Sequence, residues 1–152
     1  MKKTFFIFFV LIITIIGYYL FNDSYRFSLE AKAYYEMGKY NKSYKLAKEA
    51  YELNQYNKMA FTILTQSKIA KSWQKFINES ENYFIKINEI SNKEKITKAD
   101  KIRVKMMLQI IIAEYKNLKH STFLSQTLKD KAYNKYRKAK ELYDGIFKKT
   151  IK

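Results

Sequence analysis

The chain has 152 residues and a net charge of +16, from 30 Lys and Arg residues against 14 Asp and Glu residues. It contains no cysteine, which excludes a disulfide framework, a thiolate metal site and a lipid-modified cysteine. Lys2 and Lys3 supply two of the positive charges and every acidic residue follows position 22, so the remainder of the chain carries about +14.

An apolar run at residues 5–21 is the strongest single feature of the sequence. It holds 17 residues, interrupted only weakly by one threonine and one glycine. An apolar α-helix needs roughly 17–25 residues to cross a bilayer. Tyr18 and Tyr19, near its far end, are suited to the headgroup layer. We therefore expect residues 1–22 to form a transmembrane signal-anchor.

A cleaved signal peptide is the alternative, because it also has a basic start and an apolar centre. Its cleavage site needs paired small residues, whereas the run ends in bulky residues at positions 18–21, which favours an uncleaved anchor. Lys2 and Lys3 favour a cytoplasmic N-terminus. We expect a single-pass protein of the bacterial inner membrane with its C-terminal domain in the periplasm.

The positive charge has two interpretations. A field of this size attracts polyanions and anionic lipid surfaces. However, Lys outnumbers Arg by 27 to 3, and the chain is rich in Ile, Asn, Tyr and Phe while it lacks Pro. That composition is typical of AT-rich codons, which would place lysines on a solvated surface without selection for binding. Both interpretations stay open.

The spacing of apolar residues after residue 22 is helical, with no alternating strand pattern. It predicts a helix over residues 24–37, with Ser24 as its N-cap and Gly38 at its end. A second helix is predicted over residues 41–54. Two helices joined by so few residues must fold back antiparallel, so we expect a helical hairpin.

Residues 24–57 resemble the tetratricopeptide repeat, a two-helix unit of 34 residues. The matching positions are Phe27, Ala31, Ala33, Tyr34, Tyr35, Gly38 and Tyr40, followed by Ala47, Ala50, Leu53 and Asn57. Ser43 stands where the family usually has alanine, and Gln55 where a proline separates repeats. The next segment matches only half a repeat, through Phe61 and Leu64. Repeat units need neighbours to bury their faces, so the rest of the chain or another protein must supply that surface.

The resemblance implies a binding module, because tetratricopeptide repeats hold peptides or helices in a groove lined by the first helix of each repeat. The groove positions it implies are Tyr25, Ser28, Lys32, Tyr35 and Glu36, with Met59, Thr62, Gln66 and Ile69 from the following segment. Aromatic and Met side chains are common at interfaces. The alternative is that the tyrosines of the hairpin only fill a core.

A heptad stripe follows the hairpin and predicts one long helix from residue 57 to residue 91. Its members are Ile63, Ala70, Ile77 and Phe84, with Trp73 and Ile87 on the interleaved positions. At about 1.5 Å per residue the helix would be roughly 50 Å long. A break near Asn78 is the alternative, because Gln66 and Ser80 weaken the interleaved row.

The remaining residues predict two more helices. Residues 91–95 read as a connection, and residues 97–100 resemble a capping box that opens a helix ending near Lys119. That helix contains an apolar segment at residues 106–112, which should be buried on more than one side. The last helix is predicted over residues 122–149, with one stripe of Leu124, Leu128, Ala132, Tyr136, Ala139, Leu142 and Ile146.

The predicted fold class is therefore all-α. It comprises an N-terminal transmembrane helix (residues 1–22), a TPR-like hairpin (residues 23–57) and an antiparallel bundle of long helices (residues 58–152) that is continuous with the hairpin. The hairpin should stack on one end of the bundle.

No constellation of catalytic residues is apparent in the sequence. The single histidine, His120, has no other soft or imidazole ligands to share a metal with, and its position favours a structural role near a helix C-terminus. Glu79 and Glu81 point to different sides of a helix, and three glycines are too few for a phosphate-binding loop. We expect no enzymatic activity, no cofactor and no metal.

The sequence thus predicts a membrane-anchored scaffold that docks other envelope proteins through the hairpin groove, for example in a flagellar motor or secretion apparatus. One alternative is a basic domain that binds anionic lipid or another polyanion. Nucleic acid is not expected, since Arg, the preferred reader of bases, is nearly absent. Another alternative is self-association through the heptad stripe.

Overall fold

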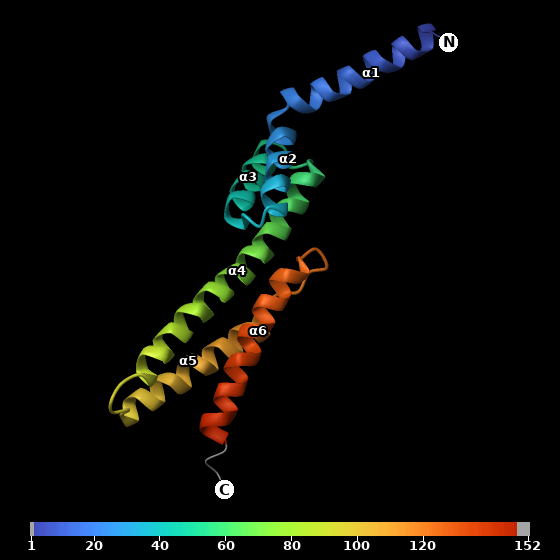
Figure 1. The fold of residues 1–152 in the computed structure, drawn as a ribbon. Helices are drawn as coiled ribbons and strands as arrows, with labels where there is room; N and C mark the ends of the chain where they lie inside the picture. Colours follow the sequence, from blue (N-terminus) through green and yellow to red (C-terminus); the bar gives the residue numbers. More distant parts are fainter. Residues whose placement is uncertain (1, 149–152) are drawn as a thin grey trace. The chain divides into compact units, whose positions relative to one another are not determined.

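The computed structural model describes the backbone of residues 2–148 and the side chains of residues 5–14, 17 and 22–148. Every regular element in this part of the chain is helical, which confirms the all-α class. The order is α1 (Lys2–Phe21), α2 (Asp23–Glu36), α3 (Tyr40–Leu53), α4 (Lys58–Ser91), α5 (Lys98–Asn117) and α6 (Gln126–Tyr143), followed by a π-helical segment at Asp144–Lys148 (Figure 1).

The chain divides into two compact units within α4, after Lys71. The first unit includes α1, and we call the rest of it, made of α2, α3 and residues 58–71 of α4, the hairpin unit. The second is the bundle unit, which contains the rest of α4, α5 and α6. The beginning of the long helix therefore packs with the hairpin, although the sequence pattern assigned it to the bundle.

Helix α1 carries the apolar run. Among the residues that the structure describes, no helix is long and apolar enough to cross a membrane. The predicted span at residues 5–21 includes positions 15, 16 and 18–21, whose side chains, those of Tyr18 and Tyr19 among them, lie outside the described ones. The structure gives no support to a membrane span, and the span stays a prediction.

Helix α2 begins one residue after α1 ends, at a cap that the sequence pattern misplaced. Asn22 has extended backbone angles, and its side chain accepts a hydrogen bond from the Tyr25 N–H at 3.4 Å. The predicted N-cap, Ser24, is instead buried inside the helix, and its Oγ donates to the Ala50 carbonyl of α3 at 2.7 Å. Asn and Ser are both good N-caps, and the tertiary contact with α3 decides between them.

The turn between α2 and α3 depends on Gly38, as predicted. Gly38 is the residue after the C-cap Met37 and has a φ of +74°, a left-handed angle that glycine adopts without strain. Its N–H donates to the Tyr35 carbonyl and the Lys39 N–H donates to the Tyr34 carbonyl, which closes the helix end. This turn reverses the chain, so that α3 runs antiparallel to α2.

Small residues form the contacts between α2, α3 and the beginning of α4. Ala31 and Ala47 pack with Ile63, and all three are buried. Ser43 lies at the same level and donates from its Oγ to the Ala31 carbonyl at 2.7 Å, while its Oγ lies 2.6 Å from that of Ser67 on α4. With such short side chains between them, the three helix backbones approach closely.

Helix α4 is continuous over 34 residues, so the predicted long helix is confirmed and the alternative break near Asn78 does not occur. Its heptad stripe is buried throughout, but in two different places: Ile63 lies in the hairpin unit, whereas Ile77 and Phe84 lie in the bundle unit. These stripe residues are thus packed within the single chain, whereas Ile87 is only partly buried.

In the bundle unit, α5 runs antiparallel to α4 and α6 runs antiparallel to α5. Trp73 on α4 is 1% exposed and donates from its Nε1 to the Lys119 carbonyl at 2.8 Å. At the same level, the rings of Tyr115 on α5 and Tyr136 on α6 stack at 4.5 Å. Toward the other end, the Gln109 side chain on α5 donates to the Tyr143 hydroxyl on α6.

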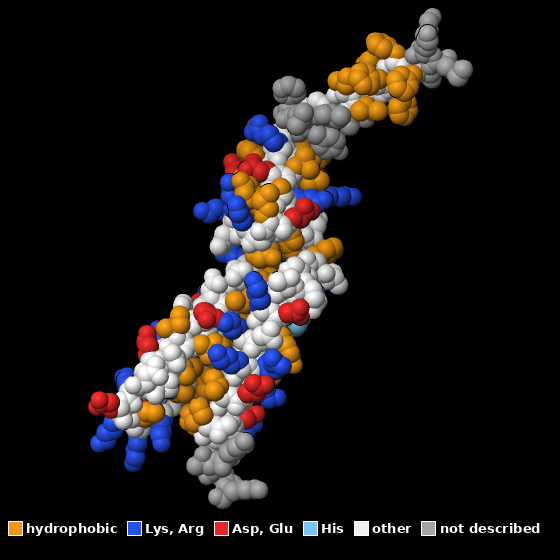
Figure 2. Space-filling view, in the orientation of Figure 1, with side chains coloured by type: hydrophobic (Ala, Val, Ile, Leu, Met, Phe, Trp, Pro, Cys, Tyr) orange, Lys and Arg blue, Asp and Glu red, His pale blue; other side chains and the backbone are white. Residues whose placement is uncertain are grey.

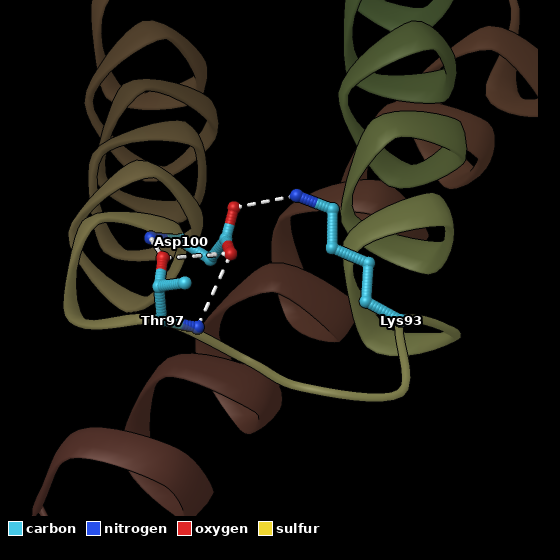
Figure 3. A network of polar contacts seen from close by, with 3 residues as sticks. All are labelled: Lys93, Thr97 and Asp100. Carbon is cyan, nitrogen blue, oxygen red and sulfur yellow. Dashed lines mark hydrogen bonds and ion pairs between the residues drawn. The ribbon is translucent and has the colours of Figure 1, made fainter.

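The capping box predicted at residues 97–100 is present and also ties α5 to α4 (Figure 3). The Thr97 Oγ accepts from the Asp100 N–H at 3.1 Å, and the Asp100 Oδ2 accepts from the N–H and hydroxyl of Thr97. Asp100 is 3% exposed, and its other oxygen accepts from the Lys93 Nζ at 2.8 Å. These bonds to the charged form lower the pKa of Asp100 to about 2, first through Lys93 and then through Thr97.

Two predictions for the C-terminal helices were wrong in detail. Met106, in the apolar segment expected to be covered, is 55% exposed, whereas Leu108 and Ile111 of the same segment are buried. Helix α6 begins at Gln126 rather than near residue 122, because Ser125 caps it by accepting from the Leu128 N–H. Residues 118–125 form the connection, in which Leu124 is already buried.

We predict that Gly38→Ala destabilises the hairpin unit by about 1 kcal/mol, because an L side chain is strained at a positive φ. A Cβ at Gly38 would meet no atom within 4 Å, so the loss reflects backbone strain alone. Gly145→Ala, in the π-helical segment and equally free of contacts, is the matched control and should be neutral or stabilising. Chemical denaturation followed by far-UV circular dichroism measures both; equal effects would contradict the role of Gly38.

We also predict that Asp100→Asn removes part of the acid dependence of stability. The pKa of Asp100 is lower in the folded state than its ordinary value of 3.8, so its stabilising contribution is present above that value and is lost as the pH falls towards about 2. The variant should therefore be less stable than the parent near neutral pH, and the difference should shrink between about pH 5 and pH 2.

Trp73 fluorescence during denaturation at several pH values measures this difference. Asp130→Asn controls for the loss of one carboxylate, since the Asp130 side chain is exposed on α6 and accepts from the neutral Gln126 amide. A constant difference between the parent and Asp100→Asn across the pH range would show that Lys93 and Thr97 do not stabilise the carboxylate.

Candidate partner-binding face

The nine predicted groove residues all lie in the hairpin unit, five on α2 and four on residues 58–71 of α4. Three of them have exposed side chains: Lys32, Glu36 and Thr62. Five are half-buried: Tyr25, Tyr35, Met59, Gln66 and Ile69. The ninth, Ser28, is fully buried.

On α2, the exposed residues form a charged pair beside an aromatic one. The Lys32 Nζ lies 4.0 Å from a Glu36 carboxylate oxygen, one helical turn further on. Such an exposed pair contributes little to stability, because water screens it and both side chains are mobile. Tyr35 packs edge-to-face on Tyr40 at 5.4 Å, and burial, with a smaller effect of Tyr40, raises the pKa of its hydroxyl. Lys32 and Glu36 are therefore available to a partner, with Tyr35 held between the helices.

Ser28 does not belong to an accessible face. It is 0% exposed, and its Oγ donates to the Tyr25 carbonyl at 2.8 Å while it accepts from the Asn57 Nδ2 at 3.3 Å. Asn57 also donates to the Ser24 Oγ at 2.9 Å. Ser28 is thus part of a buried polar network that holds the beginning of α4 against α2, so it contacts no partner in this packing.

On α4, the predicted residues are divided between core and surface. Met59 packs against the core cluster of Ala31, Ala47 and Ile63. Thr62 is exposed, and its hydroxyl donates to the Lys58 carbonyl at 2.7 Å within its own helix. The core contact of Met59 places the first turns of α4 beside α2, which brings the two halves of the predicted face together.

Two surface features of the hairpin unit were not identified from the sequence. At the Gly38 turn, Lys42 lies 4.0 Å from the Tyr34 ring centroid and donates to the Tyr34 hydroxyl. At the α3–α4 turn, three large apolar side chains are exposed: Leu53, Tyr56 and Phe61. The sequence could have indicated the exposure of these three residues, because they lie at or between helix ends and outside the apolar stripes that are buried.

Aromatic residues of the bundle unit fill its core. The Trp73 ring contacts Tyr115 at 6.3 Å and His120 at 5.6 Å, both edge-to-face. Tyr115 also contacts Phe76 and Tyr136. Tyr115 and Tyr136 thus serve packing in this unit, and His120 lies against the indole of Trp73.

Carboxylates of the bundle unit show one unusual pairing. Burial raises the pKa of Glu114 on α5, and the nearby Glu79 on α4 raises it further, with Lys75 acting in the opposite direction. Glu79 itself pairs with Lys75 at 3.6 Å and is partly exposed. Within the described side chains, no three His, Asp or Glu residues are close enough together to hold a metal ion.

Comparisons with protein-family models, with curated proteins and with solved structures found no match to this chain. The resemblance of residues 24–57 to the tetratricopeptide repeat therefore stays a prediction. What the geometry adds is specific to these residues: Lys32, Glu36 and Thr62 are exposed, with Tyr35 and Met59 half-buried around them.

Proposed function

We propose that this protein is a non-enzymatic scaffold or adaptor, anchored in a bacterial inner membrane by residues 5–21, that docks other envelope proteins in the periplasm through the face made by α2 and the beginning of α4. The docking residues are Tyr25, Lys32, Tyr35, Glu36, Met59, Thr62, Gln66 and Ile69. A large envelope assembly, such as a flagellar motor or a secretion apparatus, is the natural setting.

The observation that supports docking best is the placement of the α2 and α4 residues side by side. Met59 of α4 packs against the cluster that contains Ala31 of α2, and the exposed Lys32 and Glu36 follow Ala31 on α2. The Gly38 turn and the buried Ala31, Ala47 and Ala50 agree with the positions that resemble the tetratricopeptide repeat. A face with half-buried aromatic and Met side chains and a charged edge suits a helix or peptide of another protein.

The observation that supports anchoring is the exposure of α1. Nine consecutive apolar side chains at residues 5–13 are 44–77% exposed in the chain by itself, and they cover the described part of α1 on the face that Figure 2 shows. A helix that is apolar on all sides has to be buried, in a core or in a membrane. Because the chain leaves this surface uncovered, a bilayer is the environment we propose for it.

We predict that Lys32→Glu with Tyr35→Ala abolishes recovery of the partner. The change reverses the exposed charge and removes the aromatic ring beside it, while Lys32 and Glu36 contribute little to stability. Crosslinking of the full-length protein in its native membranes, followed by mass spectrometry of what is recovered, measures the loss. Far-UV circular dichroism checks that helicity is retained, and Lys32→Glu alone tests the face without altering packing.

The matched control is Lys42→Glu with Tyr34→Ala. It makes the same chemical changes on the same hairpin, but at a contact outside the proposed face. Partner recovery that survives the first double change, or that is lost equally in the control, would refute the docking face. Recovery that collapses between low and moderate salt would favour polyanion or lipid binding by the basic surface instead, and recovery of only the protein itself would favour a homo-oligomer.

We predict that Phe9→Arg with Ile12→Arg releases the protein from membranes, because a charged side chain near the bilayer centre costs about 2.5–3.5 kcal/mol on insertion scales. Met37→Arg is the control, since Met37 is an apolar side chain that is already exposed on the hairpin. Resistance to carbonate extraction measures anchoring. A parent protein that alkaline carbonate removes from membranes would contradict the anchor.

A further inference from the structure

One end of the hairpin unit carries three large apolar side chains from two neighbouring helices and the turn between them. Leu53 is the last residue of α3 and is 57% exposed, Tyr56 lies in the turn and is 93% exposed, and Phe61 lies in the first turn of α4 and is 55% exposed. The Phe61 ring lies 5.7 Å from that of Tyr51 on α3, so the first turn of α4 lies beside the last turn of α3. We call Leu53, Tyr56 and Phe61 the turn patch.

The turn that presents Tyr56 is held firmly. The Asn54 Oδ1 accepts from the Tyr56 N–H at 3.0 Å, and the Asn54 carbonyl accepts from the Asn57 N–H at 3.1 Å. The Asn57 side chain accepts from the Ala60 N–H at 3.1 Å and so caps α4. A turn with this many bonds fixes the position of Tyr56, although the Tyr56 side chain itself contributes almost no buried surface.

The same bonds place the turn patch at the N-terminal end of α2. The Asn57 Nδ2 donates to the Ser24 Oγ, and the Ser24 Oγ donates to the Ala50 carbonyl, so residues 50 and 57 both lie beside the first turn of α2. Only Asn22 separates that helix from α1. Consecutive Cα atoms are 3.8 Å apart, so the end of the apolar run lies within roughly 8 Å of the first residue of α2.

We propose that the turn patch contacts the interfacial layer of the bilayer that holds α1, with Tyr56 among the lipid headgroups and Leu53 and Phe61 against the acyl boundary. This inference rests on the proposed anchoring. If residues 5–21 are in a bilayer, the end of α2 next to them is at its surface, and the turn patch is held at that same end.

The chemistry of the turn patch fits this surface. Tyrosine is enriched at membrane interfaces because its ring is apolar and its hydroxyl is polar. Lys58, next to Asn57, is exposed and suits anionic headgroups. The nearby acids are paired with bases: Asp23 lies 2.7 Å from Arg26, and Glu52 lies 3.5 Å from Lys48.

Single-cysteine labelling tests the proposal directly, because the chain has no cysteine of its own. Ile12→Cys, Tyr56→Cys and Met37→Cys are prepared in the full-length chain and labelled with a polarity-sensitive fluorophore. Each is reconstituted into vesicles of phosphatidylcholine and phosphatidylglycerol, with and without brominated acyl chains. Met37 is the matched control, since it is 65% exposed and follows the opposite end of α2. At about 1.5 Å per residue it lies about 21 Å from Asp23, the first residue of α2.

We expect brominated lipid to quench the labels at positions 12 and 56 and to leave the label at position 37 bright. The emission of the label at position 56 should shift to the blue in vesicles, relative to buffer without lipid. Quenching at position 12 with equal, low quenching at 56 and 37 would overturn the turn patch while the anchor stands. No quenching at position 12 would overturn the proposed anchoring itself. Equal quenching at 56 and 37 would show a hairpin lying flat, which also overturns contact by one end.

Discussion

The hairpin unit depends on the close approach of three helix backbones, which only its small side chains permit. Ala31, Ala47 and Ala50 have no exposed surface, and Ser24, Ser28 and Ser43 occupy the equivalent places between them. The serines do more than fit, because Ser24 and Ser43 each donate to a carbonyl of the neighbouring helix. A hydroxyl buried without a partner costs roughly 1–3 kcal/mol, so these residues also fix which turn of one helix faces which turn of the next.

This packing explains why the large side chains of the hairpin are at its surface. Where Ala and Ser line the contacts between the helices, the backbones are close together, and Leu53, Tyr56 and Phe61 lie outside these contacts. The bundle unit is packed with larger side chains. Trp73, Phe76 and Phe84 are buried there, and the rings of Tyr115 and Tyr136 stack on each other. Large aromatic side chains thus form the centre of the bundle unit, whereas Leu53, Tyr56 and Phe61 of the hairpin unit remain at its surface.

Local signals in the sequence were sufficient for much of the fold. Helical periodicity gave α2, α3 and α4, Gly38 gave the turn, and Thr97 and Asp100 gave the capping box. The failures involve contacts between distant residues. Ser24 was taken for a cap because its partner, Ala50, is 26 residues away, and the start of α6 was misplaced because Leu124 is buried before the helix begins.

For the candidate face, too, the sequence predicted exposure correctly where it depends on the helix itself, and failed where it depends on a distant residue. Lys32, Glu36 and Thr62 were predicted at the surface and are exposed, since their helical positions lie away from the apolar stripe. Ser28 was assigned to the face because a repeat's register places it there. Its actual environment is set by Asn57, 29 residues further along the chain, and no local pattern records that pairing.

Charge and apolar surface have different roles in this molecule. The lysines are mostly exposed, and pairs such as Lys48 with Glu52 or Arg137 with Glu141 are exposed contacts one helical turn apart that add little to stability. The chain carries a net charge of +16, and the field of its exposed charges extends over a Debye length of about 8 Å in physiological salt. The exposed apolar side chains of α1 and of the turn patch act only on contact, and one residue, Asn22, separates α1 from the helix end that holds the patch. A bilayer around α1 would therefore orient the hairpin by its apolar end and leave Lys32 and Glu36, towards the other end of α2, away from the bilayer.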